Sequence, residues 1–357
     1  YTTELAEFVD TFGSKVSPEG YNHHFWVSGG ALAVENALKT AFDWKARKLG
    51  RTDFSDCVND LGILHFKQAF HGRSGYTMSL TNTLPDKVGL FPKFDWPRVS
   101  NPFCEFDHDG NICNDIEAAE AAACAEIEAA FDQSGNKIAG IVIEPMQGEG
   151  GDNHFRPEFL SKLRQYADER EALLIFDEVQ TGFYGSGKPW FWQTTGVKPD
   201  VVSFGKKTQT CGIYANDRVN EVADNVFEKS SRINSTWGGN LVDMIRCKQF
   251  INIIERDNIA DHVTALGNHV IDGLRDIARS TDAFSSVRGC GSLIAFTLPT
   301  PDARGEMLNA LMDNGVIALP CGTRSVRFRL PLIMTMEEAG TLLERTGEAV
   351  HSQAATA

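Results

Sequence analysis

Apolar side chains recur along this chain in two patterns, at helical spacing and in short continuous runs. At residues 31–48 they recur at helical spacing directly after Ser28-Gly29-Gly30, which predicts a helix opened by a glycine turn. Residues 240–280 contain no proline and predict one long helical stretch. Further helices are predicted at 116–131, 157–170, 303–313 and 336–351.

The continuous apolar runs predict buried strands. IAGIVI ends at Glu144, ALLIF ends at Asp177, and VVSFG ends at Lys206. Two more strands are predicted at 287–299 and 325–334. Strands that alternate with helices favour an α/β fold with a mainly parallel central sheet and helices on its faces.

These elements divide into two expected domains. The large domain covers residues 1–281 and includes the long interdomain helix at about 240–280. A smaller C-terminal α/β domain covers residues 282–357. Polar stretches at 50–60 and 106–111 are predicted loops.

Composition narrows the class of protein. The 357 residues are 42% hydrophobic and 23% charged, and no apolar run approaches the ~20 residues that cross a bilayer, so we expect a soluble protein without membrane contacts. The net charge of -14 argues against a nucleic-acid partner. Eight scattered cysteines without a C-x-x-C pair indicate free thiols, hence the cytoplasm, and no metal site.

Polar groups end three of the predicted strands, at Glu144, Asp177 and Lys206. Ligands of parallel α/β sheets bind beyond the carboxyl ends of the strands, so we expect these groups to share one crevice. Any one of them alone can be an ordinary cap or ion-pair partner.

Asp177 and Val179 share one strand face, because successive side chains alternate. A carboxylate and a small apolar group suit a flat aromatic cation such as the protonated ring of pyridoxal 5'-phosphate. A buried lysine would supply the amine for its aldehyde, and Gly29-Gly30-Ala31 at a helix start would suit its phosphate. Alternation through Gly205 would place Lys206 and Lys207 on opposite faces, without deciding which one points inward.

Four motifs occur together in this chain: EPMQGE at 144–149, FDEVQTG at 176–182, FGK at 204–206 and STWGGN at 235–240. In this combination the chain resembles the class III (ω-) aminotransferases, which are pyridoxal-phosphate enzymes of fold-type I. Within that family it is most similar to the lysine 6-aminotransferases, whose pattern is echoed in AFHGRSGYTMSLTNT.

The resemblance implies roles around the cofactor ring. Lys206 is then the Schiff-base lysine, and Asp177 pairs with the pyridine nitrogen. Val179 and Phe70 cover the two ring faces, and Gln180 lies near the ring hydroxyl. Lys207 is left as an ordinary cation, solvated or paired.

The resemblance also implies a phosphate site and a homodimer. Gly30 and Ala31 would hold the phosphate through their backbone amides. Thr236 would reach that phosphate from the partner subunit.

Substrate contacts follow from the same likeness. Arg73 matches the family's contact to the substrate α-carboxylate, Arg327 the arginine that holds 2-oxoglutarate, and Glu149 the acid that neutralises this arginine when lysine is bound. One site must accept a diacid and a long amine in turn, so a switchable positive charge is physically reasonable. A static surface salt bridge between Arg327 and Glu149 is the alternative.

The implied function is transfer of the ε-amino group of L-lysine to 2-oxoglutarate, giving 2-aminoadipate 6-semialdehyde and L-glutamate. Other possibilities are an ornithine or 4-aminobutyrate donor, an aminomutase, and a catalytically impaired relative. Family members carry a segment before the region that matches Tyr1, so we expect an N-terminal segment to be missing from this sequence.

Overall fold

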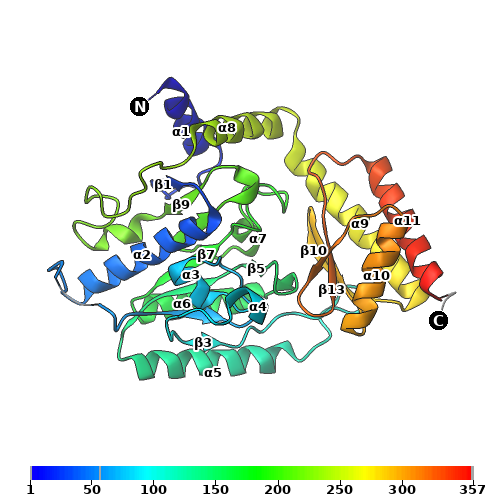
Figure 1. Cartoon of the computed structure of the whole chain (residues 1–357), viewed down its shortest axis with the longest axis horizontal. Helices are drawn as coiled ribbons and strands as arrows, with labels where there is room; N and C mark the ends of the chain where they lie inside the picture. Colours follow the sequence, from blue (N-terminus) through cyan, green and yellow to red (C-terminus); the bar gives the residue numbers. More distant parts are fainter. Residues whose placement is uncertain (1, 56–57, 355–357) are drawn as a thin grey trace.

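A computed structural model describes residues 2–55 and 58–354 (Figure 1). Its larger sheet has, within these residues, seven strands in the order β1-β9-β8-β7-β4-β2-β3. Every neighbouring pair from β8 to β3 is parallel, whereas β9 runs antiparallel to β1 and β8, which confirms the expected mainly parallel sheet. The strands are His23–Val27, Cys211–Ala215, Val201–Phe204, Leu173–Asp177, Ile138–Ile143, Gly62–Phe66 and Arg98–Val99.

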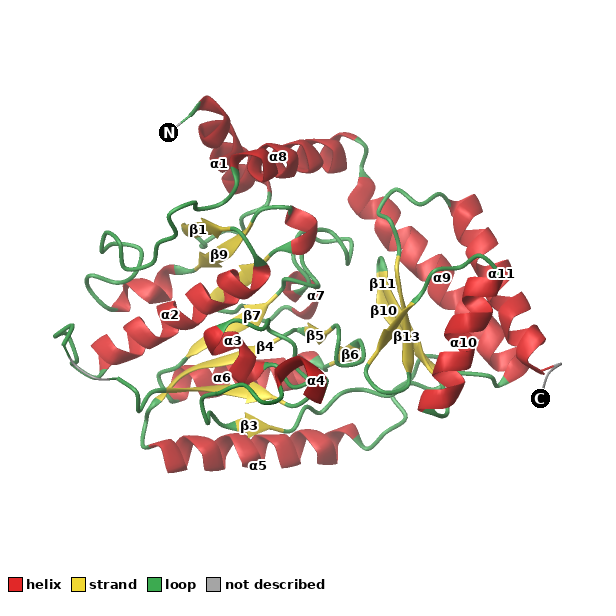
Figure 2. Ribbon diagram, viewed as in Figure 1, coloured by secondary structure: helices red, strands yellow, loops and turns green. Residues whose placement is uncertain are grey.

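Helices cover both faces of this sheet (Figure 2). On β7, Leu173 and Ile175 belong to the core that includes α2 (Gly30–Lys48). Leu174 and Phe176 belong to the opposite core, with α5 (Ile116–Ser134) and α6 (Pro157–Glu169). Because both faces are buried, the central strands are continuous apolar runs rather than alternating ones.

A second sheet lies beside the first, with strand order β10-β11-β13-β12 and antiparallel pairing throughout (Figure 1). The apolar run at 287–299, predicted as one strand, folds as two strands, because the chain turns at Gly291, whose φ is +59°. The strand predicted at 325–334 ends at Arg329. The strands are Ser285–Cys290, Leu293–Thr297, Ser325–Arg329 and Leu319–Cys321, and they pack with α10 (Pro301–Asp313) and α11 (Met336–Ala354).

The prediction of one long helical stretch at 240–280 is wrong in one respect. The segment forms two helices, α8 (Leu241–Arg256) and α9 (Ile259–Thr281). Asn258 adopts the left-handed region with φ +50° and ends one helix before the other begins. Asparagine tolerates this conformation better than most residues, so no proline is needed for the break. The buried face of α9 packs with the second sheet, and the division at residues 281 and 282 stays a prediction.

The remaining elements are short or peripheral. Helix α1 packs beside α8, and Lys15 pairs with Glu255 at 2.6 Å. No helix in the described part of the chain combines the length and apolar character that crossing a bilayer requires.

Seven cysteines are free, and Cys57 lies outside the described residues, as does part of the predicted 50–60 loop. The remaining elements are α1 (Thr3–Lys15), α3 (Gly75–Leu80), α4 (Pro85–Val88), β5 (Met146–Gln147), β6 (Asn153–His154), α7 (Trp192–Thr195), and the 3-10 helices η1 (Lys206–Thr208) and η2 (Asp217–Glu221).

Candidate active site

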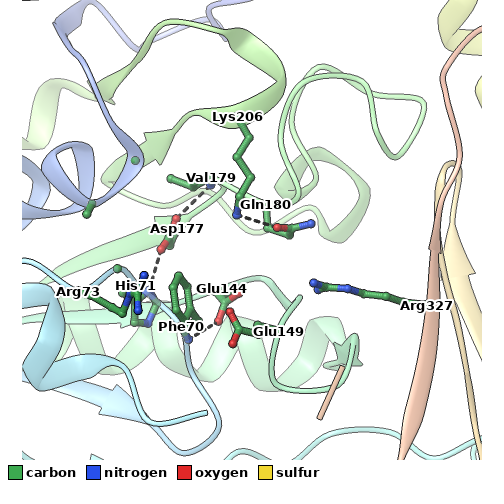
Figure 3. Close-up of a pocket in the computed structure, with 13 residues that line it drawn as sticks. Phe70, His71, Arg73, Glu144, Glu149, Asp177, Val179, Gln180, Lys206 and Arg327 are labelled. Carbon is green, nitrogen blue, oxygen red and sulfur yellow. Dashed lines mark hydrogen bonds and ion pairs between the residues drawn. The ribbon is translucent and has the colours of Figure 1, made fainter. Parts of the chain in front are cut away.

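A cavity of about 500 Å³ opens at the carboxyl ends of the central strands (Figure 3). The three strand-end groups Glu144, Asp177 and Lys206 all line it, as the strand pattern predicted. It also contains every other predicted site residue except Thr236, which is exposed and lies outside the cavity. The remaining lining residues are Gly30, Ala31, Phe70, His71, Gly72, Arg73, Glu149, Val179, Gln180 and Arg327.

Lys206 reaches the cavity through a local change of backbone conformation. Strand β8 ends at Phe204, and Lys206 begins the 3-10 helix η1 with φ +53°. Gly205 is still extended, with φ 176°, so the chain leaves the strand conformation at Lys206 itself. A left-handed lysine is uncommon and strained, as is frequent at functional sites. Its Nζ donates to Oε1 of Gln180 at 2.7 Å, and burial lowers its pKa.

Lys207 points away from the cavity. Its Nζ donates to the backbone carbonyl of Gln180 at 2.6 Å. Burial lowers the pKa of Lys207 to about 7, and the charges of Arg329 and Lys206 act in the same direction. Lys207 is thus half-buried and paired with a carbonyl group, which is the second of the two outcomes expected for it.

Asp177 is held by three donors at the end of β7. Nδ1 of His71 lies 2.7 Å from its Oδ2, while the amide of Val179 and the hydroxyl of Ser203 donate to its Oδ1 at 3.0 and 3.2 Å. Burial alone would lower the pKa of His71, but the hydrogen bond to Asp177 and its charge raise that pKa. A protonated His71 then donates to the carboxylate of Asp177 at the cavity wall.

Glu144 organises the backbone around the cavity. Its two carboxyl oxygens accept hydrogen bonds from the amides of Phe70, at 2.9 Å, and Gly148, at 3.0 Å. Burial raises the pKa of Glu144 to about 7. The strand-end pattern found this residue, but its contacts mark it as a group that positions Phe70.

The start of α2 approaches the ring-binding side of the cavity closely. A Cβ atom added to Gly30 would lie 2.7 Å from Cγ1 of Val179, so glycine is needed at this contact. The first amides of a helix lack acceptors within the helix and attract anions. Together with the carboxylate of Asp177 and the amine of Lys206, these features fit a phosphorylated pyridine aldehyde such as pyridoxal phosphate.

Glu149 and Arg327 do not form an ion pair in this structure, and their pairing when lysine is bound stays a prediction. Its carboxylate forms an ion pair with Lys87 and accepts a hydrogen bond from Thr83 at 3.1 Å. The nearest acid to Arg327 is Asp152, at 3.9 Å. Glu149 and Arg327 are both largely shielded from solvent and are not paired with each other, so the alternative of a static surface salt bridge between them is not found.

Asp152 binds the second sheet to the cavity rim. Its carboxylate accepts two hydrogen bonds from Arg329, at 2.5 and 2.6 Å, and it is buried. Burial and the neighbouring charge of Arg329 lower the pKa of Arg327. Sequence patterns pointed to none of Lys87, Asp152 and Arg329, because each depends on contacts between distant segments.

Comparisons with known proteins agree with this geometry. The family model described as aminotransferase class-III matches residues 2–350. An L-lysine-epsilon aminotransferase of Amycolatopsis lactamdurans is 46% identical, over 99% of this chain and 78% of that protein. A 4-aminobutyrate aminotransferase of Dictyostelium discoideum is 33% identical, over 93% of this chain and 69% of the relative. The solved lysine aminotransferase from M. tuberculosis, in its internal aldimine form, is 45% identical with a TM-score of 0.92, covering 99% of this chain and 80% of that one.

Proposed function

Because this chain belongs to the class III aminotransferases, we propose that it transfers the ε-amino group of L-lysine to 2-oxoglutarate, giving 2-aminoadipate 6-semialdehyde and L-glutamate. The observation that carries the proposal is the single cavity in which Lys206 and Asp177 face Glu149 and Arg327. The identity to lysine ε-aminotransferases exceeds that to the 4-aminobutyrate aminotransferase, which favours lysine as the donor.

Pyridoxal phosphate, on which this family depends, supplies an aldehyde that condenses with amines and a ring that withdraws electrons. We assign Lys206 as the residue that holds the aldehyde. In its free form, Nζ of Lys206 would accept the proton that leaves the ε-carbon of lysine and would return it. The lowered pKa of Lys206 favours the uncharged amine that this proton transfer needs.

The other ring contacts are assigned to side chains that line the same cavity. Asp177, which is hydrogen-bonded to His71, would pair with the ring nitrogen, and Val179 and Phe70 would cover the ring faces. Gln180 would contact the ring hydroxyl. The amides of Gly30 and Ala31 at the start of α2 would hold the phosphate.

The two substrates make opposite demands on the cavity. Arg327 would bind a carboxylate of 2-oxoglutarate, and Arg73 would bind the α-carboxylate of lysine. Bidentate pairing with guanidinium is well suited to both carboxylates. When lysine is bound, the charge of Arg327 has no substrate partner, and Glu149 is the mobile acid that would neutralise it.

A donor screen tests this function. The purified enzyme, loaded with pyridoxal phosphate, is given 2-oxoglutarate and either L-lysine, L-ornithine or 4-aminobutyrate, and glutamate formation is followed. We expect kcat/KM for lysine to exceed the others by at least about tenfold, which corresponds to roughly 1.4 kcal/mol. Faster turnover with ornithine or 4-aminobutyrate would reassign the donor, and turnover without an acceptor would indicate an aminomutase.

We further propose a homodimer located in the cytoplasm. Thr236 is exposed and does not line the cavity of its own chain, which is consistent with a contact to the phosphate in the partner subunit. Light scattering of the purified protein should give twice the mass of the chain. The scattered free cysteines support a reducing compartment.

A further inference from the structure

Two cations lie within reach of one carboxylate at the cavity mouth. Glu149 pairs with Lys87, and their side chains are 24% and 29% exposed. Across the cavity, the Nε and Nη1 atoms of Arg327 have no hydrogen-bond partner among the described residues. Figure 3 shows Arg327 entering from the second sheet with its guanidinium directed toward Glu149.

The position of Lys87 is fixed by a short helix and by hydrogen bonds of the segment before it. Lys87 belongs to the one-turn helix α4, which starts at Pro85. Asn82 holds the segment before this helix in place. Its backbone N–H donates to the carbonyl of Ala69 at 2.9 Å, and its side-chain Oδ1 accepts from the backbone N–H of Gln68 at 2.6 Å. Nζ of Lys87 also lies over the Phe70 ring, 5.3 Å from its centre, so its ammonium group is close to a residue that lines the cavity.

We propose that Lys87 is a specificity-determining positioning residue, which holds Glu149 away from Arg327 so that Arg327 is free to bind the carboxylate of the acceptor. The inference rests on the proposed function and extends it, because it gives Glu149 a defined partner in each half-reaction. With lysine bound, Glu149 turns to Arg327. With 2-oxoglutarate bound, Lys87 retains Glu149.

Competition between the two cations decides the expected effect. Without the ammonium of Lys87, Glu149 has Arg327 as its remaining cationic partner, and the acceptor must displace it. The lysine half-reaction needs the Glu149–Arg327 pair and is not weakened. A charged hydrogen bond in a partly exposed setting corresponds to about a tenfold change in affinity.

The test uses the Lys87→Met enzyme loaded with cofactor, because methionine has an unbranched side chain of similar length and removes the charge. We expect KM for 2-oxoglutarate to rise about tenfold while KM for lysine changes less than twofold. Lys87→Arg should restore the wild-type ratio. Lys162→Met, an exposed lysine on α6 far from the cavity, is the matched control and should change neither constant.

Two further measurements separate a specific effect from a structural one. Calorimetric binding of glutarate, an unreactive diacid, should weaken by the same factor in Lys87→Met, and also in Lys87→Gln. In a Glu149→Gln background the Lys87→Met change should have no further effect, because the two residues act as one pair.

Unchanged glutarate affinity, an equal rise of both KM values, or an effect that persists in Glu149→Gln would each overturn the role of Lys87. If wild-type enzyme does not turn over lysine, the proposed donor is wrong. The glutarate measurement still decides the role of Lys87 in that case.

Discussion

Nδ1 of His71 lies 2.7 Å from Oδ2 of Asp177, and both side chains are buried at the cavity wall. His71 follows β2 and Asp177 ends β7, so two segments separated by about a hundred residues meet as an ion pair. The hydrogen bond to Asp177 and its charge raise the pKa of His71, so the pair places a protonated imidazole behind the carboxylate.

Replacing His71 by asparagine should lower turnover. Asparagine can still donate a hydrogen bond to Asp177 but carries no charge, so the carboxylate loses its charged partner. We expect kcat to fall at least about tenfold, because removal of a residue that orients a binding side chain through a hydrogen bond commonly lowers activity by this factor. The control is the same change at His351, an exposed residue on α11, which should leave kcat unchanged. An unchanged kcat in His71→Asn would contradict the role assigned to His71.

Lys206 and Lys207 should differ sharply when each is replaced. Lys206→Ala should lower kcat by more than about 10³-fold, because no other described amine enters the cavity. After borohydride reduction of the wild-type enzyme, mass analysis should find the cofactor attached at Lys206. Lys207→Met loses only the bond to the carbonyl of Gln180 and should keep this attachment. Attachment at Lys207 instead would refute the assignment.

Removing Asp152 should destabilise the fold. Asp152→Ala leaves Arg329 without the carboxylate that accepts two of its three hydrogen bonds, in a largely buried position. Breaking such a pair costs about 3 kcal/mol of the free energy of unfolding, to be measured by urea titration. Asp132→Ala, which removes an exposed partner of Arg170, is the control and should change this free energy by less than about 0.5 kcal/mol.

The stability of the protein should fall in acid because of His65. Its Nε2 accepts a hydrogen bond from Nε of Arg98 at 3.0 Å, and its Nδ1 lies 3.3 Å from the carbonyl of Ile63. Burial, followed by the charge of Arg98, lowers the pKa of His65 to about 3. The unfolded chain takes up this proton below about pH 6.5, so the stability is complete above that pH and is lost as the pH falls toward 3.

The comparison of wild type with His65→Gln isolates this contribution. Glutamine can accept from Arg98 without titrating. Between pH 7.5 and pH 5, wild type should lose about 2 kcal/mol more unfolding free energy than the variant. Equal losses in the two proteins would show that His65 does not cause the acid sensitivity.

Periodicity predicted most elements because each depends on local burial. Helix α2, helix α6 and strand β7 lie where the apolar spacing placed them. The break at Asn258 was missed, since a left-handed residue leaves no mark in hydrophobic spacing. The strand-end groups were found because parallel strands deliver their carboxyl ends to one edge.

The sequence by itself determined the fold class, the family and the set of side chains that meet in the cavity, because strand ends and motifs are encoded locally. Only the tertiary structure decided how those groups are paired. It placed Lys206 in the cavity through a left-handed backbone, paired Glu149 with Lys87 and joined Asp152 to Arg329. Such pairings depend on distances between segments far apart in the chain, and the charge of an isolated residue does not specify which opposite charge will lie nearest.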